Sequence, residues 1–299
     1  MESRHRPAAF GATVEAVPLA LDPTLPVLLR PDGAVQIGWD PRRAVLVHPP
    51  AGLTAPDLAA VLRAMNAPHP PDALHRLARA RGLTDPAAFD TLLASLRASG
   101  VLRDSDRRPT GRSLAVRVHG CGPLSAMLTD GLRCSGARVS QTSHGNAVGA
   151  PAGVDLVVLA DYLGTDQRLV RDLHAARLPH LQVRVRDGAG LVGPLVIPGV
   201  TSCLCCADLH RTDRDAAWPA LAAQLREVIG TADRPTVLAT AALALAQLHR
   251  IIAAVRADGP AGDPPSTLNT TWELDVAAHA LRARRWPRHP MCGCWRRQE

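Results

Sequence analysis

Cys203-Leu204-Cys205-Cys206 and Cys292-Gly293-Cys294 are two close cysteine clusters that hold five of the seven cysteines in the chain. A lone C-x-x-C can be a redox motif or a chance pair. Two clusters separated by most of a domain can instead supply four thiolates to one tetrahedral zinc ion. We therefore predict a metal site that holds the C-terminal segment against the body of a fold.

The chain has 299 residues, which suits about two domains, and its net charge is +7. All 34 basic residues are arginines, so chemistry that requires a lysine is excluded. A positive balance suits an acidic protein partner or nucleic acid, but charge alone does not choose between them.

The sequence contains no segment typical of a signal peptide or a membrane span. The apolar run at 17–21 is short and contains Pro18. The longest apolar stretch, 237–255, is interrupted by a glutamine, a histidine and an arginine, which favours a buried helix. We expect a cytoplasmic protein with no membrane partner, where reducing conditions favour metal-bound thiolates over disulfides.

Alternating apolar residues and turn residues predict three strands and then three helices in residues 23–107. The expected strands are 26–30, 34–38 and 43–47, and the expected helices are 54–65, 70–80 and 85–99. Thr54 and Asp57 predict a capping box. Asp85 caps the third helix, which has Pro86 at its first position.

Residues 103–112 are charged and have no apolar period, so they predict a linker. We place the domain boundary here, which gives an N-terminal domain of residues 1–107 and a C-terminal domain of residues 108–299.

The N-terminal domain resembles the winged-helix-like peptide-recognition module typified by PqqD. The resemblance is carried by the opening L-P-V-L-L-R-P-D-G at 25–33, V-Q-I-G at 35–38, A-V-L-V at 44–47 and the closing L-L-A-S-L-R-A-S-G-V-L at 92–102. In that family the leader of a ribosomal precursor peptide adds as a strand to the third strand, beside the third helix.

The resemblance implies that Val45, Leu46 and Val47 pair with a leader and that Leu92 and Leu93 line its groove. In this mode of binding, called β-augmentation, main-chain hydrogen bonds give affinity and side-chain pockets give selectivity. These apolar residues equally suit a core. A DNA-reading winged helix would need a basic recognition helix, whereas 85–99 carries only Arg97 against two aspartates, so we expect no nucleic-acid partner.

The C-terminal domain begins with an α/β pattern. A strand at 114–119 is followed by Gly120-Cys121-Gly122 and a helix at 124–132, the order found at phosphate-binding turns of nucleotide-binding folds. Ser125 stands where the third glycine would be, and Pro123 lacks an N–H. The next strand, at 137–140, ends in no acidic residue that could hold a ribose. The glycine loop is therefore degenerate.

Asp161 follows a buried strand at 154–160, and a fourth strand is expected at 180–185. The aspartate could bind a ligand or cap the loop after it, and we favour the cap. A long helix is expected at 233–251, and two further strands are expected at 266–274 and 278–282.

The second half of this domain resembles the ThiF/MoeB-like domain of azole-forming (TOMM) peptide biosynthesis. The motifs are G-P-L-V-I-P-G at 193–199, the cysteine cluster after it, R-x-x-x-D-x-x-W-P-A-L-x-x-Q-L at 211–225 and H-P-M-C-G-C at 289–294. With the N-terminal module, nearly the whole chain is similar to the bacterial SagC-type proteins that accompany a YcaO cyclodehydratase. The fold class this implies is α/β and α+β, a winged-helix-like module followed by a Rossmann-like domain.

The family's structural zinc site implies Cys203, Cys206, Cys292 and Cys294 as ligands, because a C-x-x-C loop lets both sulfurs face one metal. Cys205 would be free, or would replace one of its two neighbours. Four thiolates leave no open coordination position, so Zn²⁺ is expected to be structural rather than catalytic.

ThiF/MoeB-type adenylating enzymes use a glycine-rich loop, an acidic ribose contact, arginines and a lysine at the phosphates, and an aspartate for magnesium. Here the loop (Gly120, Gly122, with Asp161) is degenerate and no lysine exists, so we expect neither adenylation nor ATP as a cofactor. Cys121 and Cys134 have no identifiable His–Asp partner, so we predict no catalytic residue.

The predicted function is to bind a precursor leader and present it to a YcaO-type cyclodehydratase in another chain, which would form azolines. The resemblance also implies a homodimer through the C-terminal domain. Two rivals stay open: an ATP-dependent adenylating enzyme of the ThiF/MoeB type, and a winged-helix DNA-binding zinc protein.

Overall fold

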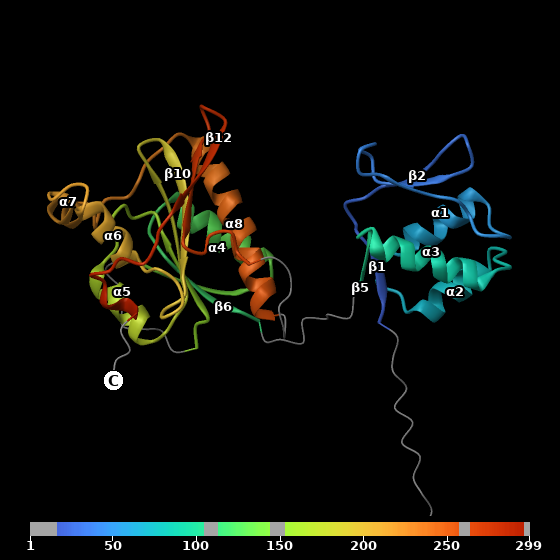
Figure 1. The fold of residues 1–299 in the computed structure, drawn as a ribbon, viewed down its shortest axis with the longest axis horizontal. Helices are drawn as coiled ribbons and strands as arrows, with labels where there is room; N and C mark the ends of the chain where they lie inside the picture. The colour runs from blue at the N-terminus through green and yellow to red at the C-terminus, as the bar shows by residue number, and fades with distance from the viewer. Residues whose placement is uncertain (1–16, 105–112, 144–152, 257–263, 296–299) are drawn as a thin grey trace, which may run out of the picture. The chain divides into compact units, whose positions relative to one another are not determined.

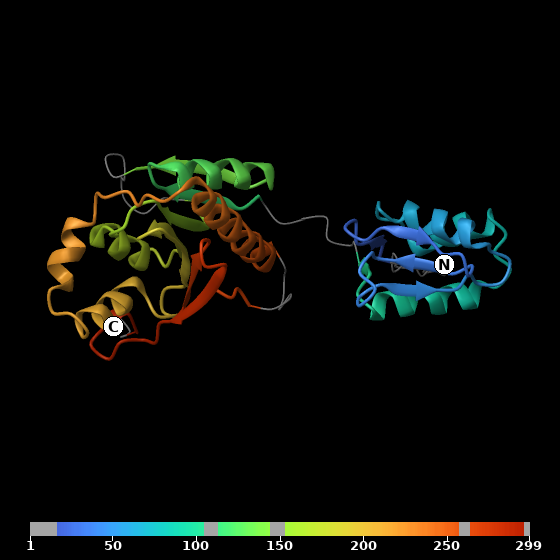
Figure 2. The ribbon, with the colours of Figure 1, turned by 90° about the horizontal axis from the view of Figure 1, so that it is seen from above.

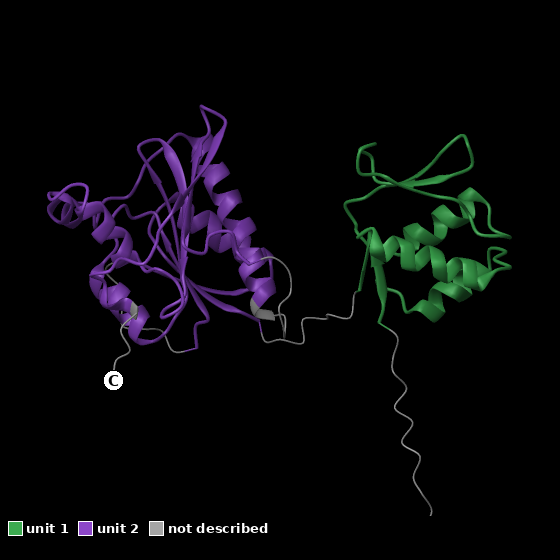
Figure 3. Cartoon of the chain, viewed as in Figure 1, with its two compact units in different colours: residues 1–110 green, residues 111–299 purple. Residues whose placement is uncertain are grey.

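The computed structural model describes residues 17–104, 113–143, 153–256 and 264–295. The chain divides into two compact units, residues 1–110 and 111–299 (Figure 3). The division falls in 105–112, which lies outside the described residues, as does the charged N-terminal segment before residue 17.

Unit 1 is a small α+β fold in which a three-stranded antiparallel sheet lies over three helices (Figures 1 and 2). Its elements are β1 (Leu19–Leu21), β2 (Val27–Leu29), β3 (Val35–Ile37), β4 (Val45–Val47), α1 (Ala55–Ala64), α2 (Pro71–Arg79), α3 (Pro86–Ala98) and β5 (Leu102–Asp104). The sheet order is β2-β3-β4, so β4 pairs with β3 alone among the described strands.

The helix starts of unit 1 follow the sequence signals. Thr54 and Asp57 form the expected capping box at α1, and the Asp85 carboxylate accepts from the Ala88 N–H at 3.0 Å at α3. Each cap satisfies a backbone N–H that the first turn would otherwise leave without a partner.

Two short strands of unit 1 were not expected. β1 pairs antiparallel with β5, with Leu21 opposite Leu102, and so joins the two ends of the unit. Arg103 and Asp104, which we assigned to the linker, therefore belong to β5. A three-residue strand offers too little alternation to be distinguished from a charged linker in the sequence.

Unit 2 is built on a mixed seven-stranded sheet of order β12-β11-β10-β9-β8-β6-β7. The strands are β6 (Ala115–His119), β7 (Arg138–Thr142), β8 (Leu156–Ala160), β9 (His180–Arg186), β10 (Ala189–Val196), β11 (Thr270–Asp275) and β12 (Ala280–Arg285). Strands β6, β7, β8 and β9 run parallel to one another. Strands β9, β10, β11 and β12 pair antiparallel in that order. The chain turns from one side of β6 to the other between β7 and β8, and ligands of such folds bind where the order reverses.

Helices cover both faces of this sheet. α4 (Pro123–Cys134) and α8 (Arg234–Arg256) pack on one face, and α5 (Gln167–Ala175), α6 (Leu204–Thr212) and α7 (Trp218–Gln224) lie on the other (Figures 1 and 2). Strand β10 and helices α5, α6 and α7 were not expected from the sequence. β11 begins later than expected because 265–270 forms turns, with Leu268 N–H donating to Pro265 and Thr270 N–H to Thr267.

α8 is the one helix in the described part of the chain that is long and apolar enough to cross a membrane. It packs against β9 and β10, and 44% of its most apolar window is buried. Core helices of globular proteins pass the same test. Its buried positions are Thr236, Val237, Thr240, Ala241, Ala244, Gln247, Leu248, Ile251 and Ile252.

Candidate functional site

The structure brings together the four cysteines implied as metal ligands. The sulfur atoms of Cys203, Cys206, Cys292 and Cys294 all lie within 4.8 Å of one another. Cys203 is the N-cap of α6, where its sulfur accepts from the Cys206 N–H at 3.4 Å. The other pair comes from the C-terminal turn, with Cys294 in the short 3₁₀ helix at Gly293–Trp295. Cys205 is not part of this group of four and is half-buried.

The spacing of the sulfurs fits a tetrahedral ion. The Sγ–Sγ distances are 3.7 Å for Cys203–Cys206, 3.6 Å for Cys203–Cys292 and 3.5 Å for Cys206–Cys294. Four sulfurs each about 2.3 Å from one metal are about 3.8 Å apart, close to these values. The cluster can therefore hold a metal ion, with all four positions of a tetrahedron taken by protein.

The electrostatics of the cluster also suit a cation. A hydrogen bond from Cys203 and, more weakly, one from Cys294 lower the pKa of Cys206 to about 4, while burial opposes this. Burial raises the pKa of Cys294 to about 12. A divalent ion at the centre of the group would favour deprotonation of the thiols that bind it. The N-terminus of α6 adds a positive dipole end on the same side.

Polar contacts outside the cysteines hold the same C-terminal segment. His289 is buried, its Nε2 lies 2.8 Å from the Asp213 carboxylate, and its Nδ1 accepts from the Met291 N–H at 3.1 Å. His210 Nε2 contacts the Pro287 carbonyl at 3.1 Å. Arg288 donates to the Val200 carbonyl at 2.7 Å. The contacts to Asp213, Pro287 and Val200 were not expected from the sequence, because these partners lie more than 70 residues apart in the chain.

His210, Asp213 and His289 also place three ligand atoms within 4.8 Å of one another. Their hydrogen bonds already account for this arrangement, since His289 Nε2 pairs with Asp213 and His210 Nε2 with the Pro287 carbonyl. These three residues therefore help to attach the C-terminal segment to α6.

Asp161 lies at the N-terminus of α4, at the switch point of the sheet. Its carboxylate accepts from the Leu124 N–H at 3.0 Å and from the Ser125 N–H at 3.3 Å. The residue is 1% exposed. Asp161 is thus a cap, but of α4 rather than of the loop that follows it, because the parallel neighbours β6 and β8 bring their carboxyl ends together.

The glycines of the turn make room for this carboxylate. A Cβ on Gly120 would lie 2.6 Å from Asp161 Oδ2, and one on Gly122 would lie 2.8 Å from Asp161 Cγ. The Gly122 N–H donates to the Ser125 hydroxyl oxygen at 3.1 Å, and Pro123 has no backbone N–H. An internal anion therefore occupies the position where a helix N-terminus would receive phosphate.

The space beside this turn is small. A cavity lined by His119, Ala160 and Tyr162 has a volume of about 10 Å³, roughly the room for one water molecule. His119 is buried, with Nδ1 3.1 Å from the Thr142 hydroxyl. Cys121 and Cys134 are both exposed. Neither cysteine takes part in the groups of metal-binding geometry found among the described residues.

The residues implied in peptide binding differ in their access to solvent. Val47 and Leu93 are in the core of unit 1, and Val45 and Leu92 are half-buried against that core. Leu46 is 52% exposed and lies in register with Gln36 and the exposed Leu28 on the outer face of the sheet. A ligand at the β4 edge can reach Leu46 directly, but not the side chains of Val47 and Leu93.

No protein-family model matches the chain, and no curated protein matches it by sequence. Solved structures match its fold. A heterocyclase in complex with substrate and cofactor superposes with a TM-score of 0.66 at 17% identity, over 93% of this chain and 39% of that one. The heterocyclase TruD gives 0.64 at 18% identity, over 93% and 42%.

MccB from E. coli, solved with ATP, gives a TM-score of 0.58 at 13% identity, over 93% of this chain and 99% of MccB. At these identities the likeness concerns the fold. The chain spans about two fifths of the length of the two heterocyclases and nearly all of MccB. It shares the mixed α/β architecture of these heterocyclase and MccB structures.

Proposed function

We propose that this protein is a non-catalytic recognition and scaffolding component of an azole-forming peptide-maturation system. Unit 1 is a winged-helix-like module that captures the leader of a ribosomal precursor peptide, and unit 2 docks a YcaO-type cyclodehydratase. That enzyme converts Cys, Ser or Thr residues of the peptide to azolines with ATP. Tethering raises the local concentration of the peptide core at the active site.

The main argument against catalysis is that the Asp161 carboxylate accepts hydrogen bonds from the Leu124 and Ser125 N–H groups. A nucleotide phosphate at this helix end would meet an anion instead of free donors. The lack of any lysine removes a second phosphate contact.

The four-cysteine site is, in this proposal, a structural Zn²⁺ site. Sulfur ligands and tetrahedral spacing fit zinc, and a site closed by four thiolates offers no position for water or substrate. We also propose a cytoplasmic location and a homodimer through unit 2, where Leu238 of α8 is an exposed apolar side chain.

The leader is proposed to add to the free edge of β4. Main-chain pairing there would extend the β2-β3-β4 sheet, and Leu46 would provide a side-chain contact. The probe is a labelled synthetic leader from a short Cys/Ser/Thr-rich precursor encoded beside this protein and a YcaO gene, and binding is measured by fluorescence anisotropy.

Leu46→Asp is expected to weaken leader binding about tenfold, which corresponds to about 1.4 kcal/mol. Leu28→Asp is the matched control, because Leu28 is exposed on the same face but lies on β2, at the opposite edge. Equal losses in the two variants would contradict binding at β4. Salt-sensitive binding to duplex DNA that displaces the leader would support a DNA-binding protein instead.

The rival function, adenylation, is suggested by the likeness to MccB, which covers the whole length of an ATP-bound protein. We expect no ATP–pyrophosphate exchange by the full chain with the precursor peptide present. Clear exchange above a protein-free blank would overturn the proposal.

A further inference from the structure

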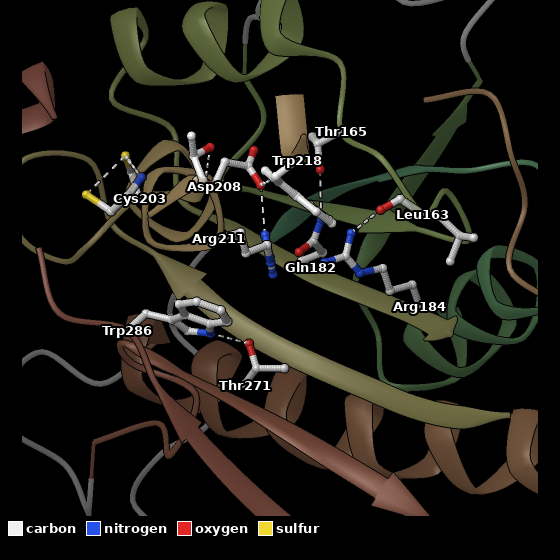
Figure 4. A network of polar contacts seen from close by, with 12 residues as sticks. Leu163, Thr165, Gln182, Arg184, Cys203, Asp208, Arg211, Trp218, Thr271 and Trp286 are labelled. Atoms are coloured by element: carbon white, nitrogen blue, oxygen red, sulfur yellow. Dashed lines mark hydrogen bonds and ion pairs between the residues drawn. The ribbon is translucent and has the colours of Figure 1, made fainter. Parts of the chain in front are cut away.

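A cavity of about 200 Å³ lies between β9 and the helices α6 and α7. None of the four clustered cysteines lines it, but Asp208, Trp218 and Pro219 also line a neighbouring pocket beside Cys203 and Cys292. Figure 4 shows that Gln182 and Arg184 of β9 face Asp208 and Arg211 of α6 across this space, with Trp218 beside them. The opposite side chains of β9, including Val183, belong to the core under α4 and α8.

Arg184 is a buried cation without a carboxylate partner. Its Nη1 donates to the Leu163 carbonyl, its Nε has no hydrogen-bond partner, and no described acidic residue forms an ion pair with it. Burial, and next the nearby charge of Arg211, lower the pKa of Arg184 to about 9. A buried charge that lacks an ion pair costs stability, which a bound anion would recover.

Arg211 is the second cation at the cavity, and it is held rigidly. Its guanidinium lies 5.1 Å from the ring centre of Trp218 and 4.8 Å from that of Trp286. It donates to Asp208 at 2.8 Å, and the Trp218 indole N–H donates to the same oxygen at 3.1 Å. The Trp286 indole is fixed in turn by the Thr271 hydroxyl at 2.9 Å.

The charges around the cavity favour an anion. Three arginines line it, the buried Arg184, Arg211 and the exposed Arg226, against the single carboxylate of Asp208. A planar guanidinium group can pair with two oxygens of a carboxylate or of a phosphate. The Asp208 carboxylate in the same lining repels a phosphate dianion more strongly than a singly charged carboxylate, so we favour the carboxylate. The volume is below the roughly 300–1,000 Å³ of cofactor pockets and suits a ligand of about one amino-acid residue.

We propose that this cavity binds a carboxylate group of a peptide, with Arg184 and Arg211 as its cationic partners. The carboxylate comes from an acidic side chain or from a peptide C-terminus. The walls formed by Leu163, Pro219 and Ala222 then contact the aliphatic part of the ligand. This site does not depend on the function proposed above for unit 1.

The test is a titration of the full-length, metal-loaded chain with two probes of the same shape. One is the negatively charged N-acetyl-glutamate α-amide, and the other is the neutral N-acetyl-glutamine α-amide. The readout is the ¹⁵N–¹H signal of the Trp218 indole, assigned with Trp218→Phe. We expect a saturable shift with the glutamate probe and none with the glutamine probe. N-acetyl-glycine, which has only a terminal carboxylate, distinguishes the two sources, and saturation by either carboxylate supports the proposal.

Arg184→Met is expected to weaken the binding of the carboxylate probe at least about tenfold. Arg282→Gln, an exposed arginine of β12, is the matched control and should bind as the parent does. If Arg184→Met does not fold, the unfolding temperature of the parent protein is measured with each probe instead. A carboxylate probe should raise this temperature, and the glutamine probe should not. Equal binding of the glutamine probe, tighter binding of inorganic phosphate, or no saturable binding would overturn the proposal.

Discussion

The carboxylate of Asp161 lies at a helix N-terminus where folds of this topology receive phosphate. Because it is buried and accepts hydrogen bonds from two backbone N–H groups, it caps α4 from within the protein. The tight glycine turn, which in sequence resembles a ligand-binding loop, is needed here to fit a side chain of the protein itself.

Asp161→Ala is expected to lower the free energy of unfolding of unit 2 by about 2–4 kcal/mol, because it leaves two buried N–H groups without an acceptor. Urea denaturation followed by circular dichroism measures the loss. Asp130→Ala, an exposed position in α4, is the control and should change stability by less than about 0.5 kcal/mol. An Asp161 variant as stable as this control would show that the cap does not support the fold.

His180 at the start of β9 makes stability depend on pH. Burial lowers its pKa to about 4, and the neighbouring His174 acts in the same direction. The unfolded chain, with a histidine pKa of about 6.5, binds more protons than the folded one between about pH 4 and 6.5. Stability therefore falls as the pH drops through this window.

Between pH 7 and pH 5 this histidine alone should cost about 2 kcal/mol of folding free energy. Protonation of metal-binding thiolates adds its own acid dependence, so the measurement compares the parent with His180→Leu in the same buffers. The variant should lose about 2 kcal/mol less than the parent over this range. Identical pH profiles would mean that His180 is not buried as a neutral group.

At the scale of elements, α6 connects the two candidate sites of unit 2. Its first turn carries Cys203 and Cys206, and its later turns carry Asp208 and Arg211 at the cavity (Figure 4). The C-terminal turn attaches to α6 through the cysteines and through the His289–Asp213 pair. A metal bound there would fix the N-terminal end of α6 and, through it, the position of Arg211.

Cys292→Ser is expected to lose stoichiometric metal and to destabilise unit 2 by several kcal/mol, since structural zinc contributes on the order of 10 kcal/mol to folding. Metal content by atomic absorption and unfolding by urea are the two readouts. Cys134→Ser, an exposed cysteine at the end of α4, should keep both metal and stability. Full metal content in Cys292→Ser would exclude it as a ligand.

At the scale of the whole molecule, the chain is two units with separate hydrophobic cores. The described cysteines all lie in unit 2 and none in unit 1. Metal removal should therefore act on one unit only.

Calorimetry of the full chain should show two unfolding transitions, and a chelator should lower the temperature of the one that belongs to unit 2 while leaving the other unchanged. The units have their own cores, so each can unfold cooperatively. The metal-bound Cys134→Ser protein provides the reference trace. A shift of both transitions by the chelator would mean that the two units are energetically coupled.

Local patterns in the sequence predicted the capped starts of helices α1 and α3, the strands β6 to β9 and the two close cysteine clusters. Each depends on signals within a few residues, such as caps, alternation or C-x-x-C spacing. Which groups meet across the sheet depends on the tertiary structure. It placed Asp161 on α4, closed unit 1 with β1 and β5, and set Arg184 opposite Arg211, because strand order and helix packing join residues that no local pattern connects.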